Sequence, residues 1–437
     1  MPALDKRAIT LKGARRTIPT PAPGRTRQAM PGKFGNAKVS AKHRQKAAKL
    51  HGRLGQAAAC GDVARTRETR KAFLNSFSAR AVAVAEAARK KDIKLTCAEA
   101  EKLASTLDPR IEPQETVRLT WKVKSDQSYR PIFRFDLRRT ALQRLLAHAI
   151  HAEHDLHPGQ HGVPGKGRNE AIRKAKDYID AGYSWVVSAD VKNCFGSLDA
   201  HEVAHRLNLP HQFRHILLPP SGDHIVIPHD NEGKAGKKKE VVTGRLPQGS
   251  AASPVAAAAM LAPVYGELPA CIAALGYVDD IALFCQSYGD AVSAYNALRG
   301  ALQGHQAGPL HLKYGYVRQA HDGFRFLGYW IWSDVHGARA RPTDAKLEDL
   351  DQKLIACDAG GGKDRRTVAR DILRGWLSAF REWDLDEYGI TALVNICNPH
   401  LKAVDVAAMV AFHLATPPKD LPTHGGAHYV DLLQLAG

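Results

Sequence analysis

Two adjacent aspartates, Asp279 and Asp280, follow an aromatic residue, Tyr277, and stand between two short apolar runs. The runs, 271–276 and 281–285, have the length of strands, so the segment predicts a β-hairpin with the acid pair at its turn. Neighbouring carboxylates repel one another and are stabilised by divalent cations, and hard oxygen ligands of this kind suit Mg²⁺. A solvated Asp-Asp turn is ordinary turn chemistry and is the alternative.

The charge of the chain favours a polyanionic partner such as nucleic acid. Its 437 residues carry a formal net charge of +18, and clustered Lys and Arg bind phosphates in a salt-dependent way. Residues 1–50 hold 13 Lys and Arg against the single acid Asp5, are interrupted by Pro and Gly, and show no apolar periodicity. We therefore expect residues 1–55 to form a basic arm that is mobile or ordered by a partner; a solubilising tail is the alternative.

Composition is that of a globular protein, with 44% hydrophobic and 24% charged residues, and the length leaves room for two or three domains. The sequence shows neither a signal-peptide core nor an apolar run long enough to span a membrane. The seven cysteines lack the CxxC spacing of zinc sites and do not suggest a disulfide framework. We expect a reduced, cytoplasmic protein without a membrane partner.

The hydrophobic pattern predicts an α+β protein. Residues 56–108 read as two helices, whereas 117–124 and 129–133 form a hairpin with a basic face. Residues 184–191 have the composition of a buried strand, and a helix opens at Ser253 with Pro254 in its first turn. The other expected elements are helices at 137–156, 168–181, 199–207 and 288–302, a hairpin at 224–245 with lysines at its tip, strands near 311–318 and 324–332, and helices from 343 to 412.

A site for two metal ions needs a third carboxylate from another strand. Asp190 stands at the end of the predicted strand 184–191, although an Asp at that place is also a common helix N-cap. A second signal is the segment around Gln248 and Gly249, where Gly permits close backbone approach and Gln can hydrogen-bond a base or a sugar.

Four motifs, in this order and spacing, resemble the palm of reverse transcriptases over about residues 117–332. They are Asp190-x4-Phe195, Pro247-Gln248-Gly249-x3-Ser253-Pro254, Tyr277-x-Asp279-Asp280 and Phe326-Leu327-Gly328. The chain most resembles the bacterial branch with group II intron, retron and phage-defence enzymes, and 373–380 is similar to the thumb helix of group II intron enzymes. The implied fold is a right-hand polymerase, with a basic arm at 1–55, N-terminal helices and fingers at 56–182, a palm with part of the fingers at 183–335, and a helical thumb with a C-terminal extension at 336–437.

The resemblance also implies residue roles. Two Mg²⁺ ions would be held by the catalytic Asp190, Asp279 and Asp280 together with Val191. Phe195 would exclude a ribose 2′-hydroxyl, and the remaining dNTP-binding residues would be Lys122, Arg130, Gln248, Gly249 and Lys313, the last in a stretch that departs from the family pattern. The primer grip would be Phe326, Leu327 and Gly328, and nucleic acid would also meet Lys166, Arg168, Tyr277, Arg374 and Trp376. For the basic strand residues a solvated face is the alternative, and for the primer grip a plain core strand.

The function implied by the resemblance is RNA-directed DNA synthesis from dNTPs, on a dedicated noncoding RNA and in phage defence. Two alternatives stay open. One is a template-independent or protein-primed DNA polymerase on the same fold. The other is a catalytically quiet, maturase-like RNA-binding scaffold, against which the intact acids argue. The protein could form an oligomer under any of these three functions.

Overall fold

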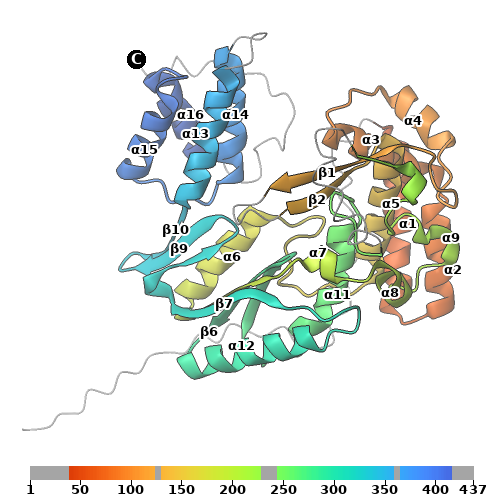
Figure 1. Ribbon diagram of the computed structural model, residues 1–437, viewed down its shortest axis with the longest axis horizontal. Coiled ribbons are helices and arrows are strands. Elements are labelled where there is room, and N and C mark those ends of the chain that lie inside the picture. The colour runs from red at the N-terminus through yellow and green to blue at the C-terminus, as the bar shows by residue number, and fades with distance from the viewer. Residues whose placement is uncertain (1–38, 124–128, 228–243, 359–364, 416–437) are drawn as a thin grey trace, which may run out of the picture.

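The computed structural model describes residues 39–123, 129–227, 244–358 and 365–415 (Figure 1). Most of the expected basic arm, the turn at 125–128, the lysine-bearing hairpin tip and the last 22 residues of the chain therefore lie outside the described residues. The described elements are a mixture of helices and small sheets, so the expected α+β class is confirmed. No helix among the described elements is long and apolar enough to cross a membrane.

The N-terminal helices form a bundle in which the first three pack around α5 (Leu137–Glu153) and the fourth packs on the third. They are α1 (Ala41–Ala59), α2 (Val63–Leu74), α3 (Phe77–Lys90) and α4 (Cys97–Ser105). Each begins at a side chain that accepts a hydrogen bond from a backbone N–H in its first turn: Ser40, Asp62, Ser76 and Thr96. Thr96 and Glu99 form a reciprocal capping box.

Helix α1 corrects two expectations of the sequence. It begins inside the segment assigned to the basic arm, and Ala47 and Leu54 are completely buried in the bundle. Its many Lys and Arg residues lie along the more exposed side of the helix, so the sequence shows only a narrow apolar stripe, with Ala47 and Leu54 seven residues apart. Residues 56–108 also hold three further helices, α2 to α4, where two were expected.

The central sheet has the order β5-β6-β3-β7, with all neighbours antiparallel. Its strands are β3 (Trp185–Val191), β5 (Ala273–Tyr277), β6 (Asp280–Cys285) and β7 (Leu312–Gln319). One face, which includes Val187 and Ala189, joins a core with α11 (Ser253–Gly266) and α12 (Tyr288–Gln303). The opposite face, which includes Val186, joins a second core with α6 (Arg168–Asp180) and the C-terminal elements.

The C-terminal elements start with the antiparallel strands β8 (Phe324–Phe326), β9 (Tyr329–Asp334) and β10 (Gly337–Pro342). Four helices follow, shown in blue in Figure 1: α13 (Asp344–Asp358), α14 (Arg365–Ala379), α15 (Glu387–Cys397) and α16 (Ala403–Ala415). They pack around buried Leu373, Trp376 and Leu393.

A third, small sheet has the order β2-β1-β4 and its own apolar core. It contains the expected hairpin β1 (Val117–Val123) and β2 (Tyr129–Arg134), with β4 (Ile225–Val226) parallel to β1. Short helical segments connect the larger elements: α7 (Cys194–Ser197), α8 (Ala200–Arg206), α9 (His211–Arg214), η1 (Gly222–His224) and η2 (Ala320–Asp322). In Figure 1 the hairpin extends between the N-terminal bundle and the blue helices.

Candidate active site

Three aspartates lie at one end of the central sheet. Asp190 of β3 is directly opposite Asp280 of β6 in the antiparallel register, so their side chains leave the same face of the sheet. Asp279 stands in the two-residue turn between β5 and β6, as the hairpin pattern predicts. The fold thereby brings the end of β3 and the β5–β6 turn, about 90 residues apart in the chain, together at the three predicted carboxylates.

The turn that carries Asp279 is anchored and strained. The backbone N–H of Val191 donates a 2.9 Å hydrogen bond to the carbonyl of Asp279, which ties the turn to the end of β3. Val278 has a φ of 61°, a conformation that a β-branched residue rarely adopts. Gly162 packs behind it, since a Cβ there would lie 2.9 Å from the Val278 side chain. Strain of this kind is often found at functional sites, where the surroundings hold it in place.

The pKa values of the site are shifted because several acidic side chains lie close together at the edge of a hydrophobic core. Burial raises the pKa of Asp280 to about 7, and the charges of Asp279 and Asp190 act in the same direction. Burial also raises the pKa of the neighbouring Cys194 thiol, with further contributions from Asp279 and Asp190. Such an arrangement favours either protonation or a bound cation.

The donor set fits Mg²⁺, because carboxylate oxygens are the ligands this ion prefers. Asp190, Asp279 and Asp280 would hold the ions, with the backbone of Val191 beside them. Within the described parts of the chain, no group of three acidic, His or Cys side chains is already drawn together as a metal-binding cluster. Because like charges repel, an acidic set of this kind is stabilised when a divalent cation neutralises it.

Strand β7 presents Tyr314, not Lys313, to the carboxylates. Asp190 pairs with Tyr314 and Val191 with Leu312, so Lys313 is the extra residue of a β-bulge. Burial raises the pKa of the Tyr314 hydroxyl, and Asp280, Asp190 and Asp279 add to the effect. Lys313 is exposed, and its expected part in nucleotide binding stays a prediction.

The predicted nucleotide residues beyond β3 lie on short, well-anchored segments. Phe195 is half-buried in α7, which follows Asp190 directly, and packs against the larger core. The carbonyl of Gln248 accepts a 2.8 Å hydrogen bond from the N–H of Phe133 in β2. Gly249 has a φ of 107°, and a Cβ there would lie 2.2 Å from the Phe133 carbonyl oxygen. Glycine is required at this position because the loop lies directly on the β2 backbone.

The β1–β2 hairpin has one basic face, as the alternation of its sequence predicts. Lys122 and Arg130 are opposite each other in the register and both are exposed. A second pair of exposed cations, Arg118 and Arg134, is found on the same face. Like charges directly opposite each other destabilise a hairpin, so this face is suited to a bound anion.

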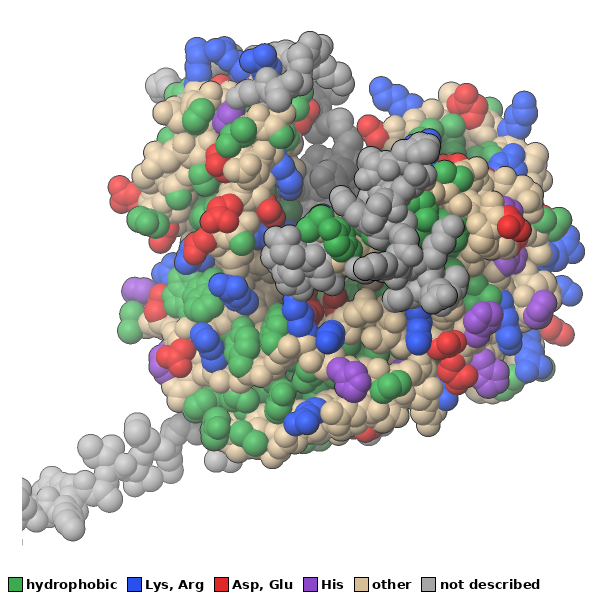
Figure 2. All heavy atoms as spheres, viewed as in Figure 1, with side chains coloured by type: hydrophobic (Ala, Val, Ile, Leu, Met, Phe, Trp, Pro, Cys, Tyr) green, Lys and Arg blue, Asp and Glu red, His purple; other side chains and the backbone are tan. Residues whose placement is uncertain are grey.

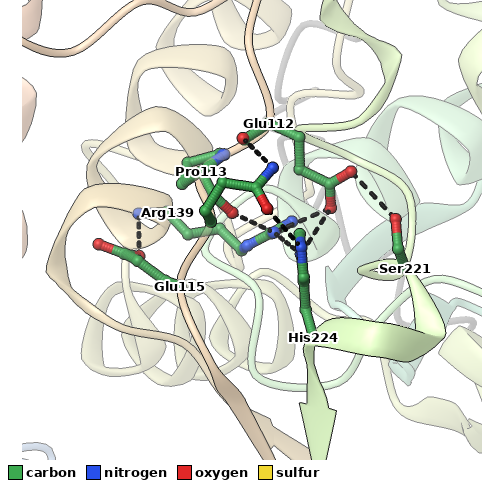
Figure 3. A network of polar contacts seen from close by, with 7 residues as sticks. Glu112, Pro113, Glu115, Arg139, Ser221 and His224 are labelled. Carbon is green, nitrogen blue, oxygen red and sulfur yellow. Dashed lines mark hydrogen bonds and ion pairs between the residues drawn. The ribbon is translucent and has the colours of Figure 1, made fainter.

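One buried side chain, Arg139, holds the root of this hairpin (Figure 3). Its guanidinium donates to the Glu112 carboxylate at 2.8 Å and to the Pro113 carbonyl at 3.1 Å, and lies 3.4 Å from Nδ1 of His224. Glu115 accepts hydrogen bonds from the first backbone N–H groups of α5. The segments that enter β1 and β4 are thereby tied to the helix that follows β2.

The predicted primer grip is a tight turn between β8 and β9. Leu327 and Gly328 both have positive φ, 52° and 80°, as in a type I′ turn. The side chains of Phe326 and Leu327 are buried, so they pack in the core while the turn backbone remains for contact with a ligand. The Gly328 carbonyl accepts a hydrogen bond from Thr343, just before α13.

Several predicted nucleic-acid contacts have partners within the protein. Arg168 donates to the carbonyl of Ala379, and its guanidinium lies 4.4 Å from the centre of the Phe380 ring. Lys166 donates to the carbonyl of Pro158. These cations therefore join parts of the fold, and their contact with nucleic acid stays a prediction.

Trp376 also has partners within the protein, and its contact with nucleic acid stays a prediction. The indole is buried against Phe380 and Trp383, and its N–H donates to the Lys346 carbonyl at 3.2 Å. It belongs to the core of the C-terminal helices, because the apolar stripe of α14 faces inward there. Arg374 and Tyr277 are half-buried, and their contact with nucleic acid stays a prediction.

The surface is hollowed between α13–α16 and the lobe of the N-terminal helices (Figure 2). The exposed β1–β2 hairpin reaches toward the C-terminal helices across this hollow. The pKa of Asp349 in α13 is lowered mainly by its bond to Lys346, and Lys122 of β1 also contributes. The basic hairpin and the C-terminal helices thus border this depression.

Comparison with known families agrees with this geometry. Residues 122–331, slightly less than half of the chain, match the family model described as reverse transcriptase (RNA-dependent DNA polymerase). This stretch is therefore similar to a reverse transcriptase domain, the kind of domain that catalyses RNA-directed DNA polymerisation, a nucleotidyl transfer. It includes all three aspartates and the tight turn of Leu327 and Gly328. No curated protein matches the chain.

Proposed function

We propose that the protein is an RNA-directed DNA polymerase with a right-hand arrangement. The central sheet is the palm, the β1–β2 hairpin belongs to the fingers, and α13–α16 form the thumb. The observation that carries the proposal is the register of Asp190 opposite Asp280, with Asp279 in the adjoining turn, inside the region that matches reverse transcriptases.

When bound, two Mg²⁺ ions supply charge for activating the primer 3′-hydroxyl and for stabilising the leaving pyrophosphate. The chain contributes Asp190, Asp279 and Asp280 as their ligands. Lys122 and Arg130 offer a pair of cations for the triphosphate. Phe195, five residues after Asp190, and the Gln248–Gly249 loop, which lies on β2, position the sugar and base of the nucleotide.

For its biological setting, we propose a dedicated noncoding RNA as template, DNA as product and a role in phage defence. The resemblance of the four motifs to the group II intron, retron and phage-defence branch supports this assignment. The net charge of +18 suits a protein that keeps hold of an RNA partner.

The test uses purified protein together with the nucleic acid that accompanies it. With Mg²⁺ and labelled dNTPs, the wild type should incorporate label and the variant Asp279→Ala/Asp280→Ala should not. Ribonuclease treatment before the dNTPs are added should abolish synthesis if RNA is the template. Synthesis that survives ribonuclease would favour untemplated or protein-primed polymerisation. If the protein binds RNA tightly but incorporates no dNTP on any primed RNA, it is an RNA-binding scaffold and the polymerase proposal is wrong.

A further inference from the structure

Strand β7 carries a row of side chains that the residue roles above do not use. Tyr314, Tyr316 and Arg318 occupy alternate positions, so they lie on one face of the strand. The register puts Tyr314 opposite Asp190 and Tyr316 opposite Ser188, which makes this the face that carries the carboxylates. The row therefore begins beside the catalytic group and runs back along β3.

The contacts within the row form a stacked series. The rings of Tyr314 and Tyr316 are 6.0 Å apart at an interplanar angle of 20°. The guanidinium of Arg318 lies 5.1 Å from the centre of the Tyr316 ring. Tyr314 is 39% exposed, so its ring is available to a ligand.

The row is also fixed in place. The backbone N–H of Arg325 in β8 donates to the Tyr316 hydroxyl at 3.3 Å, and Ser188 donates to the Arg325 carbonyl at 2.9 Å. The side chain of Arg325, like that of Arg318, is exposed. Aromatic faces followed by cations on a rigid strand are suited to stacking with sugars or bases and to binding phosphates of a single strand.

The direction of the row identifies the strand. Phe195 lies beyond the end of β3, on the side where the nucleotide is proposed to bind, whereas β7 is antiparallel to β3 and leads away from it. A strand whose 3′-hydroxyl sits at the carboxylates must leave the site on the side opposite to the incoming nucleotide. It would pass Tyr314 first, then Tyr316 and Arg318.

We propose that Tyr314, Tyr316 and Arg318 form a binding track for the last nucleotides of the DNA strand that is being extended. The inference rests on the proposed polymerase function and deepens it. Tyr314 contacts the terminal nucleotide through its ring, and Arg318 contacts a phosphate further upstream. The track depends on the Tyr-Gly-Tyr sequence of β7 in this chain, which departs from the pattern that reverse transcriptases have at this strand.

Photo-crosslinking tests the placement. A DNA primer annealed to RNA carries 5-iododeoxyuridine at its 3′-terminal position, or the RNA carries 5-iodouridine at the paired position, and no dNTP is added. The labelled primer should crosslink to Tyr314, as mapped by mass spectrometry of the peptides. The track would be wrong if only the label in the RNA template crosslinked to β7, or if neither label crosslinked to β7.

Affinity for the same duplex tests the chemistry. Tyr314→Ala should weaken binding about tenfold, whereas Tyr314→Phe should bind within about twofold of the wild type because it keeps the ring. Arg318→Gln should reduce the slope of log affinity against log salt by about one. Tyr288→Ala, which removes an exposed tyrosine of α12, a helix on the opposite face of the central sheet, should change neither quantity.

The outcomes separate the track from the proposed function. If the wild type incorporates dNTPs and Tyr314→Ala binds the duplex normally, the track is wrong and the polymerase stands. If the wild type incorporates nothing but crosslinks through Tyr314 to the labelled primer, the nucleic-acid track stands and the polymerase proposal fails.

Discussion

Asp190 and Asp280 lie opposite each other on neighbouring antiparallel strands, with their side chains on the same face. Like charges in this relationship destabilise a sheet. In metal-free buffer Asp280→Asn should therefore raise the free energy of unfolding by about 1 kcal/mol, as measured by urea denaturation. Mg²⁺ should stabilise the wild type and leave the variant unchanged, because the variant lacks one ligand.

The same variant should lose at least about 100-fold in dNTP incorporation, since metal ions supply several kcal/mol of charge stabilisation. Asp371→Asn, at an exposed position of α14, is the matched control and should alter neither stability nor incorporation. A destabilised Asp280→Asn protein would contradict the interpretation that these acids repel each other.

Gly249 provides a second prediction. An alanine there would need a φ of 107° and would place its Cβ 2.2 Å from the Phe133 carbonyl oxygen. Gly249→Ala should therefore lower the free energy of unfolding by about 2 kcal/mol or more and raise the KM for dNTPs, because the Gln248 loop must move.

Gly52 is the control for Gly249. It lies in α1, where a Cβ would meet nothing within 4 Å. Gly52→Ala should stabilise the protein by up to about 1 kcal/mol, because alanine favours a helix more than glycine does. Equal effects of the two substitutions on thermal unfolding would show that the contact with Phe133 does not constrain the loop.

The sequence could predict the residues of the site but not its register. Asp190, Asp279 and Asp280 follow from a strand end, a hairpin turn and the order of the motifs. Which side chain of β7 faces them depends on the bulge at Lys313, and one residue of slip reverses the two faces of a strand. Tyr314 and Tyr316 were visible as alternate aromatic residues, yet nothing in the sequence indicated the face on which they lie.

Packing explains the other differences. Trp376 stands on a basic, amphipathic helix, and only the tertiary structure shows that its indole packs against Trp383. Arg168 is bonded to Ala379, about 200 residues later, a contact that local patterns cannot indicate. In α1 the basic residues dominated the composition and concealed the buried face with Leu54.

Arg139 connects the root of the basic hairpin to α5, so its removal should affect both stability and substrate binding. Arg139→Met leaves Glu112 without its 2.8 Å partner, and a loss of about 3 kcal/mol is expected. At temperatures where the variant is folded, the KM for dNTPs should rise more than kcat falls, since the hairpin carries the proposed triphosphate contacts. Arg138→Met, at the partly exposed neighbouring position, should have a much smaller effect on both measurements.

Phe195 is predicted to select the sugar. Its half-buried ring is only five residues beyond Asp190, and an aromatic ring beneath the nucleotide leaves no room for a 2′-hydroxyl. Phe195→Ala should raise the ratio of kcat/KM for rNTPs to that for dNTPs by about 10- to 100-fold, a change of one to three kcal/mol in discrimination. Phe195→Tyr, which keeps the ring, should discriminate like the wild type. Unchanged selectivity in the alanine variant would remove Phe195 from this role.

The N-terminal bundle should lose stability in mild acid because of His51. The ring is buried against His151, His148 and Phe73. Burial, together with the charges of His148 and His151, lowers the pKa of His51 from 6.5 to about 4. Below pH 6.5 the unfolded chain takes up a proton that the folded chain refuses until about pH 4, so stability falls as the pH falls through this window.

Between pH 7 and pH 5 this difference amounts to roughly 2 kcal/mol for His51 alone. Urea unfolding should therefore show that the wild type loses free energy of unfolding between pH 7 and pH 5. In His51→Gln this loss should be smaller by about 2 kcal/mol. His201→Gln, at an exposed position of α8, should keep the full loss. If His51→Gln is as sensitive to acid as the wild type, other groups are responsible for the loss of stability. The neighbouring His151, whose pKa burial also lowers to about 4, would then be the first residue to replace.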